Sequence, residues 1–243
     1  LLRGARSLDD SLTFRLVQLF NLGSRRFEQI YGEAAGMESE SFLETYDLPT
    51  LSVEERTALL RKLGGGGRAA AIVTNRPCSS PPGVFNTPEA EIGVHAAGFD
   101  RMPCVASGDL GWQATALGFD VQAFLKPSPV HLLAGLRKAL GEEGDRSVEM
   151  AIRLAHFGEM DPAWQALDGS RLVLFEDAPK GHTSARAAAA LLLERGVQMD
   201  LLQFGIATGP DKIEALTAVG ARVHPGSASS RARRTCGWTR APT

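Results

Sequence analysis

Several features that mark particular protein classes are missing from this sequence of 243 residues. Its three cysteines (Cys78, Cys104 and Cys236) form no CxxC pair, which argues against a disulfide framework and against a cysteine zinc site. This cysteine usage suits a reducing compartment, so we expect a cytoplasmic protein. No run of ~18 apolar residues occurs, and nothing predicts a membrane-spanning helix. The formal net charge of -2 indicates neither a nucleic acid nor a membrane partner.

The two ends of the chain are unusual. The segment 1–4 has no initiator Met and no signal-peptide layout, so we expect the chain to begin inside a longer reading frame. Residues 227–243 are small and basic and show no apolar period, which predicts a disordered tail. Such a tail either contacts phosphates or is a solvated tail or an aberrant chain end without a function.

The first 66 residues predict a helical, cap-like segment. Leu12, Leu16 and Leu19 recur at helical spacing, and Leu22 and Gly23 should end that helix. Ser24 is a candidate cap for the next helix. Ser52 precedes an acidic first turn, and that helix should stop at the glycine run 64–67. No strand signal precedes residue 69.

From residue 67 to residue 226, apolar strands alternate with helices. The expected strands are 68–74, 102–106, 121–125, 171–175, 201–207 and 221–224, and the expected helices are 87–97, 130–140, 147–157, 183–195 and 210–219. This alternation predicts βαβ units and an α/β fold, with a Rossmann-like parallel sheet core flanked by helices. Residues 171–175 form the clearest buried strand. Ligands of such sheets bind beyond the carboxyl ends of the strands, so polar residues at those ends are the candidate site residues.

Glu176 and Asp177 directly follow the strand 171–175. Two adjacent carboxylates at a strand end repel each other and lose solvent, and a hard cation such as Mg²⁺ would offset both costs. The alternative is structural, since an acidic residue there can cap the Ala-rich helix that follows.

Lys126, Thr74 and Asn75 complete the candidate site. Lys126 follows the expected strand 121–125 and precedes Pro127, so it could balance carboxylate and phosphate charge; the alternative is a solvated surface lysine. Thr74 and Asn75 offer a hydroxyl, an amide and turn N–H groups that suit a phosphate or an oxyanion. The alternative for them is an ordinary polar turn.

Other motifs are not supported. The glycine run 64–67 has no Gly-Lys-Ser/Thr ending and precedes its strand, so it favours a flexible hinge over a P-loop. The five histidines show no metal-binding spacing, and only His182 lies near the carboxylate pair in sequence. No GxSxG supports a serine nucleophile. A nucleotide-binding doubly wound domain of another kind would need a GxGxxG after a strand, and none is found.

The order of these signals resembles that of the haloacid dehalogenase-like (HAD) superfamily. Residues 71–77 (AIVTNRP) resemble its second motif, whose Thr or Ser holds the phosphoryl group. Residues 124–129 (FLKPSP) look like the third motif, with Lys126 as its lysine. Residues 172–181 (LVLFEDAPKG) look like the fourth motif, in which Glu176 and Asp177 would bind Mg²⁺. The resemblance covers residues 68–226 and implies that 1–66 is the inserted cap.

The same resemblance implies a nucleophile that the sequence does not contain. The family uses an Asp in a DxD motif after its first strand, and no apolar strand followed by DxD precedes residue 68. We therefore expect a Mg²⁺-dependent phosphatase acting on a small phosphorylated metabolite, present as a truncated chain without its nucleophile and one central strand. The alternative is a non-catalytic relative that binds a phosphorylated ligand or packs as an interaction domain. Substrate identity and oligomeric state have no readable signal.

Overall fold

The computed structural model describes residues 8, 10–46, 51–79, 87–207 and 209–225. The predicted tail 227–243 lies outside these residues. Contacts divide the chain into two compact units, Leu1–Val121 with Lys138–Leu140 and Gln122–Arg137 with Gly141–Thr243. The chain is an α/β protein, and its described residues form two small parallel sheets, one of two strands and one of three. Among the described residues, no helix is long and apolar enough to cross a membrane.

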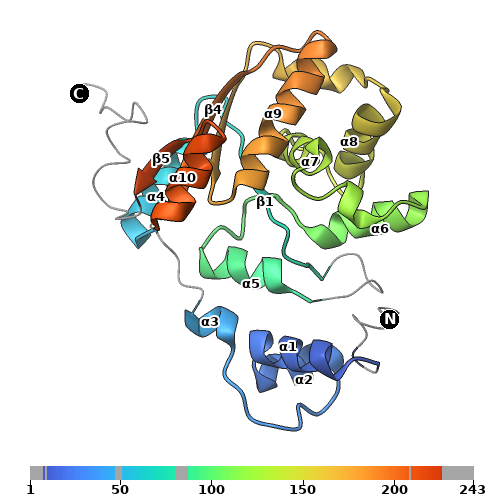
Figure 1. Cartoon of the computed structure of the whole chain (residues 1–243), viewed down its shortest axis with the longest axis vertical. Helices are drawn as coiled ribbons and strands as arrows, with labels where there is room; N and C mark the ends of the chain where they lie inside the picture. The colour runs from blue at the N-terminus through green and yellow to red at the C-terminus, as the bar shows by residue number, and fades with distance from the viewer. Residues whose placement is uncertain (1–7, 9, 47–50, 80–86, 208, 226–243) are drawn as a thin grey trace. The chain divides into compact units, whose positions relative to one another are not determined.

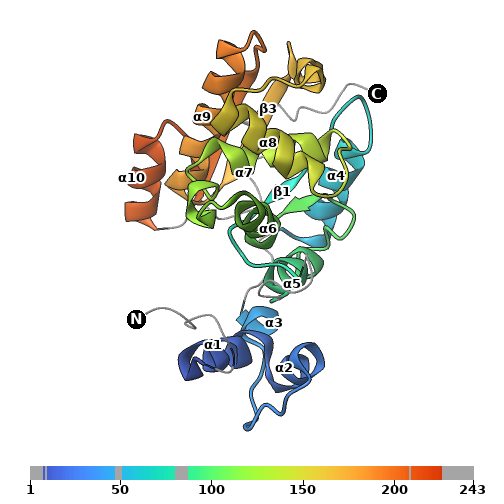
Figure 2. The same cartoon turned by 90° about the vertical axis from the view of Figure 1, so that its right-hand side faces the viewer.

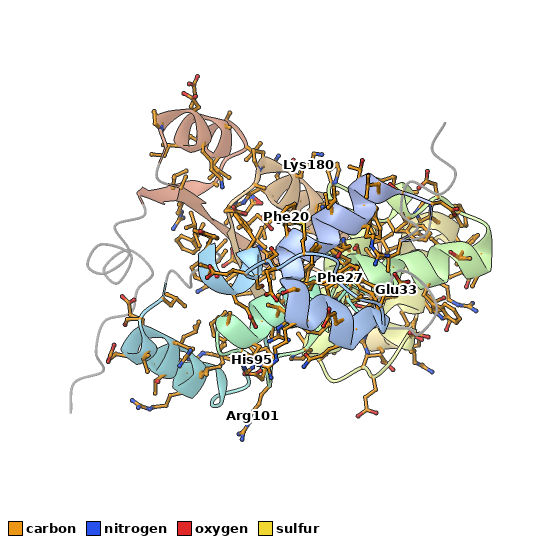
Figure 3. The ribbon with its side chains drawn as sticks, turned by 90° about the horizontal axis from the view of Figure 1, so that it is seen from below. Phe20, Phe27, Glu33, His95, Arg101 and Lys180 are labelled. Atoms are coloured by element: carbon orange, nitrogen blue, oxygen red, sulfur yellow. The ribbon has the colours of Figure 1, made fainter. Side chains whose placement is uncertain are left out.

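In the first unit, three helices form the N-terminal segment: α1 (Leu12–Leu22), α2 (Ser24–Tyr31) and α3 (Phe42–Tyr46) (Figure 1). Leu19 of α1 and Phe27 of α2, the latter labelled in Figure 3, are buried in one apolar cluster. Gly23 ends α1 as predicted, but it also precedes α2 directly, so Ser24 is the first helical residue and not its cap.

Helix α4 (Val53–Leu63) begins and ends where its caps predict. The Ser52 hydroxyl accepts a hydrogen bond from the Glu55 N–H at 3.2 Å, and the Glu55 carboxylate accepts one from the Ser52 N–H at 3.1 Å. This reciprocal capping box satisfies two N–H groups that would otherwise lack partners. No residue of α4 is fully buried, and the Arg56 guanidinium donates a hydrogen bond to the Ala97 carbonyl at 3.4 Å.

The sheet of the first unit is smaller than the sequence predicts. Strand β1 (Ile72–Val73) pairs in parallel with β2 (Cys104–Val105), and each has two residues. The helices of this part are α5 (Glu89–Ala96) and α6 (Ser107–Leu117). The expected helix 87–97 is confirmed as α5, whereas α6 was not predicted.

The expected strand 121–125 is wrong. Val121–Ala123 form a short 3₁₀ helix, η1, followed by a turn. Only Phe124 of this segment is buried, with its ring edge-on to His156 at 5.1 Å between centroids. A single anchoring side chain satisfies the apolar character of the segment without strand pairing, so Lys126 follows a turn and not a strand.

Helices build much of the second unit's core. They are α7 (Pro129–Ala139), α8 (Arg146–Phe157) and the 3₁₀ helix η2 (Pro162–Leu167), and α7 and α8 lie close together in both views (Figures 1 and 2). Their fully buried side chains include Leu133, Ile152 and Trp164. The apolar periods of 130–140 and 147–157 predict α7 and α8 to within one residue at each end.

The sheet of the second unit has the parallel order β3 (Arg171–Glu176), β4 (Asp200–Ala207) and β5 (Arg222–Pro225). Helix α9 (Pro179–Glu194) connects β3 to β4, and α10 (Pro210–Ala218) connects β4 to β5 (Figure 1). All three strands were expected. Helix α9 starts four residues before its predicted position, because Pro179 suits the first helical turn.

Strand β3 is not the fully buried strand that its sequence predicts. Val173 is 42% exposed and Phe175 is 50% exposed. The helices lie on the other face of the sheet. Gly205 of β4 faces α10, because a Cβ on Gly205 would come within 3.1 Å of Leu216. Gly205 pairs with Glu176 of β3, and side chains alternate between the two faces along a strand, so Val173 and Phe175 point away from α10. The face that carries Val173 and Phe175 therefore lacks a helix from this βαβαβ unit.

Candidate functional site

The turn after β3 holds a buried ion pair. Lys126 Nζ lies 2.5 Å from Glu176 Oε2, and both side chains are only 11% exposed. The other carboxylate oxygen, Oε1, accepts the Ala178 N–H at 3.2 Å. Both oxygens of Glu176 thus have donors, which a nearly buried carboxylate requires. The lysine comes from a segment 50 residues earlier in the chain.

Two residues of the first turn of α9 pack against Glu176. A Cβ on Gly181 would lie 2.3 Å from Glu176 Cδ, so only glycine permits this approach. His182 is fully buried, and its Nε2 lies 3.3 Å from the Glu176 carbonyl oxygen. The Glu176 peptide and side chain are therefore both fixed by the start of α9.

Asp177 is the exposed carboxylate of the turn. It is 64% exposed, and its Oδ2 accepts a hydrogen bond from Lys212 Nζ of α10 at 2.7 Å. Partial burial acts to raise the pKa of Asp177, but the hydrogen bond and positive charge of Lys212 outweigh it, so the pKa lies below its usual 3.8. The carboxylate stays ionised at neutral pH, and one side of it faces solvent.

Lys126 itself is carried by an ordered turn. The Lys126–Pro127 peptide bond is cis. The Ser128 N–H donates to the Leu125 carbonyl at 2.9 Å, and the Ser184 hydroxyl of α9 donates to the Ser128 carbonyl at 2.6 Å. These bonds tie the lysine turn to the same helix that packs on Glu176.

Thr74 and Asn75 lie in the other compact unit. The Thr74 N–H donates to the Val105 carbonyl of β2 at 3.0 Å, and the Thr74 hydroxyl accepts the Arg76 N–H at 3.2 Å. Asn75 is exposed. Thr74 therefore closes a turn at the end of β1, as the sequence predicts. Thr74 belongs to the first unit and Lys126 to the second.

The four charged residues Lys126, Glu176, Asp177 and Lys212 are suited to different tasks. Mg²⁺ takes oxygen ligands and keeps several waters, and the open side of Asp177 fits one such ligand position. Glu176 fits less well as arranged, since both of its oxygens already accept hydrogen bonds. Within the part of the chain that the structure describes, no group of three His, Cys, Asp or Glu side chains is placed to hold a metal ion.

Lys212 of this cluster and Gly181, which packs against Glu176, were not among the predicted site residues. Lys212 stands in the first turn of α10, five residues after the end of β4, so its position shortly after a strand was a usable signal. Gly181 was seen only as part of the resemblance, and its close contact with Glu176 depends on the packing of α9.

Comparison of the chain with protein-family models, with curated proteins and with solved structures gave no match.

Proposed function

We propose that this chain is a phosphoryl-binding domain of a Mg²⁺-dependent hydrolase of the HAD-like superfamily, with a Rossmann-like core, acting on a small phosphorylated metabolite. The observation that carries the proposal is the buried Lys126–Glu176 pair beside the ionised Asp177, at the carboxyl end of β3. Ligands of parallel α/β sheets bind at that end of the strands. The adjacent start of α9 adds the partial positive charge of a helix N-terminus.

Each residue has a proposed role. Asp177 would bind Mg²⁺. Glu176 would bind the same ion once its ion pair with Lys126 is broken. Lys126, once released from Glu176, would balance the charge of the phosphoryl group. For Thr74 and Asn75, which belong to the first unit, phosphoryl binding is only the role that the resemblance implies. When bound, the metal would shield phosphate charge. The sequence has no DxD motif, so no residue of this chain is proposed as the nucleophile.

Calorimetric titration of the chain with Mg²⁺, alone and with inorganic phosphate, tests the site. We expect Asp177→Asn to weaken Mg²⁺ binding at least tenfold, because it removes the charge of the open ligand. Glu214→Gln, an exposed substitution on α10, is the matched control and should leave binding unchanged. Equal Mg²⁺ affinity of the wild type and the Asp177→Asn variant would reject the assignment.

A second candidate is a non-catalytic relative that binds a phosphorylated ligand without turnover; it is favoured by the hydrogen bonds that both Glu176 oxygens already accept, which leave that carboxylate less suited to a metal ion. For residues 1–243 both candidates predict no hydrolysis of a generic phosphate ester, and robust Mg²⁺-dependent hydrolysis would show that the nucleophile assignment is wrong. The coding sequence upstream of Leu1 separates the two: an apolar strand ending in DxD supports the hydrolase, and a start codon at Leu1 supports the binding protein.

A further inference from the structure

The two carboxylates at the end of β3 each have a lysine from a distant segment of the second unit. Lys126 Nζ lies 2.5 Å from Glu176 Oε2. Lys212 Nζ of α10 lies 2.7 Å from Asp177 Oδ2. After burial and Lys212, the Glu176 side chain also acts on the pKa of Asp177, so the two carboxylates are neighbours. The four groups therefore form one cluster of charges, with the carboxylates side by side and a lysine on each of them.

This charge cluster is balanced as it stands. Two ammonium groups offset two carboxylates, so the lysines already supply the positive charge that a divalent cation would bring. An added Mg²⁺ would leave an excess of positive charge, and the ammonium next to its ligand oxygen would repel it. A cation can bind well here only if one of the lysines gives up its carboxylate.

The two ion pairs differ in how easily they break. The side chains of Lys126 and Glu176 are each only 11% exposed, so separating them would leave two nearly buried charges without partners. Lys212 is 46% exposed and Asp177 is 64% exposed. An ion pair in such contact with water is weak, and water receives the released ammonium at little cost. Lys212 is therefore the lysine that gives way first.

We propose that Lys212 is an internal counter-ion that competes with a divalent cation for Asp177 and turns to the bound anion once the cation has replaced it. This role rests on the proposed function, because it takes Asp177 as the ligand of Mg²⁺. Lys212 stands in the first turn of α10, so its backbone stays in place while its four-carbon stem lets the ammonium swing away from Asp177.

The charge cluster also indicates which class of anion suits the loaded site. With a divalent cation bound, the four side chains and the metal carry two positive charges in excess. A phosphate monoester carries nearly two negative charges at neutral pH, so it restores the balance better than a monoanion does. The cation and the dianion should therefore strengthen each other's binding, and the released Lys212 contributes to that coupling.

Calorimetric titration of the 243-residue chain with Mg²⁺ tests the competition. We expect Lys212→Gln to bind Mg²⁺ about fivefold more tightly than the wild type, which corresponds to the loss of one exposed ion pair. Lys212→Arg keeps the charge and a donor for Asp177, so its affinity should stay close to that of the wild type.

Lys180→Gln is the matched control. Lys180, labelled in Figure 3, is an exposed residue in the first turn of α9, and it forms no ion pair with the residues that the structure describes. Its substitution removes the same charge close to Asp177 in sequence without touching the contact to Lys212. Its Mg²⁺ affinity should stay within about twofold of the wild type.

Repeating the titrations with inorganic phosphate tests the second half of the role. Phosphate should raise the Mg²⁺ affinity of the wild type about threefold more than that of Lys212→Gln, because only the wild type has a released ammonium to offer. An equal effect of phosphate on both proteins overturns the contact between Lys212 and the anion.

The remaining outcomes separate this role from the proposed function. Equal Mg²⁺ affinity of the wild type and Lys212→Gln, with Asp177→Asn still weakened, overturns the competition and leaves the metal site standing. An equal gain in Lys180→Gln overturns it as well, since net charge alone would then explain the effect. Absence of Mg²⁺ binding in every variant rejects the proposed function and the role of Lys212 together.

Discussion

Gly181 sets how closely α9 can approach the end of β3. We expect Gly181→Ala to lower the free energy of unfolding by about 1–3 kcal/mol, because the added methyl group would displace the ion-paired Glu176 side chain. Urea denaturation followed by circular dichroism measures this loss. Gly65→Ala is the control, since a Cβ there meets nothing within 4 Å, and its effect should stay within about 0.5 kcal/mol. Equal stability of both variants would show that Glu176 moves aside freely.

At the residue scale, the sequence indicates which residues are candidates for the site, but it does not indicate which of their side chains contact each other. Asp177 follows a strand as predicted from the apolar run 171–175, whereas Glu176 is the last residue of that strand, β3. The pairing of Lys126 with Glu176 joins turns 50 residues apart. No local pattern distinguishes it from a pairing of Lys126 with Asp177. The partner of Asp177 is instead Lys212, because α10 begins beside the same turn.

At the element scale, α4 offers a clean test of local stability. We expect Ser52→Ala to destabilise the helix by about 1 kcal/mol, since it removes one half of the capping box. Because α4 buries no residue, the effect should stay local: amide hydrogen exchange across α4 should quicken roughly fivefold, with other elements unchanged.

Thr57→Ala is the matched control in the same helix. The Thr57 hydroxyl donates to the Val53 carbonyl within α4, and alanine is a better helix former, so exchange should slow or stay the same. Faster exchange throughout the chain in Ser52→Ala would mean that α4 supports the global fold.

Helix boundaries were predictable where a cap marks them, as at Gly23, Ser52 and Gly64. Helix α6 was missed because its sequence contains two glycines and buries few residues. The segment 121–125 was misassigned because a short apolar run does not tell a strand from an anchored turn. Strand identity was predictable for β3, but its exposure was not, since burial depends on which strands and helices are neighbours.

At the scale of the whole molecule, the two compact units differ in how their cores are built. The first unit buries its apolar residues in small clusters such as Leu22, Leu43 and Ile92. The second buries large side chains from several helices, including Trp164 and Leu133. We expect the first unit to unfold at lower urea concentration. Hydrogen exchange measured by mass spectrometry along a urea series checks this, and coincident loss of protection in both units would contradict it.

The α/β class followed from the alternation of apolar strands and helices, and the structure confirms it. The proposed boundaries 1–66 and 67–226, and the Rossmann-like arrangement, stay predictions. Local periodicity determines elements, whereas the order of strands in a sheet depends on contacts between distant segments. That is also why β1 and β3, both predicted from apolar runs, prove to belong to different sheets.

The pairing of β3 with β4 divides the amides of β3 into two kinetic classes. The Asp200 N–H donates to the Ser170 carbonyl at 2.9 Å, so the peptide groups of Leu172 and Leu174 point toward β4 and those of Val173 and Phe175 point away from it. The amides of Leu172 and Leu174 can exchange with solvent deuterium only when β3 separates from β4. Exchange at the even positions of β3 therefore reports the integrity of the sheet, and exchange at the odd positions is independent of this pairing.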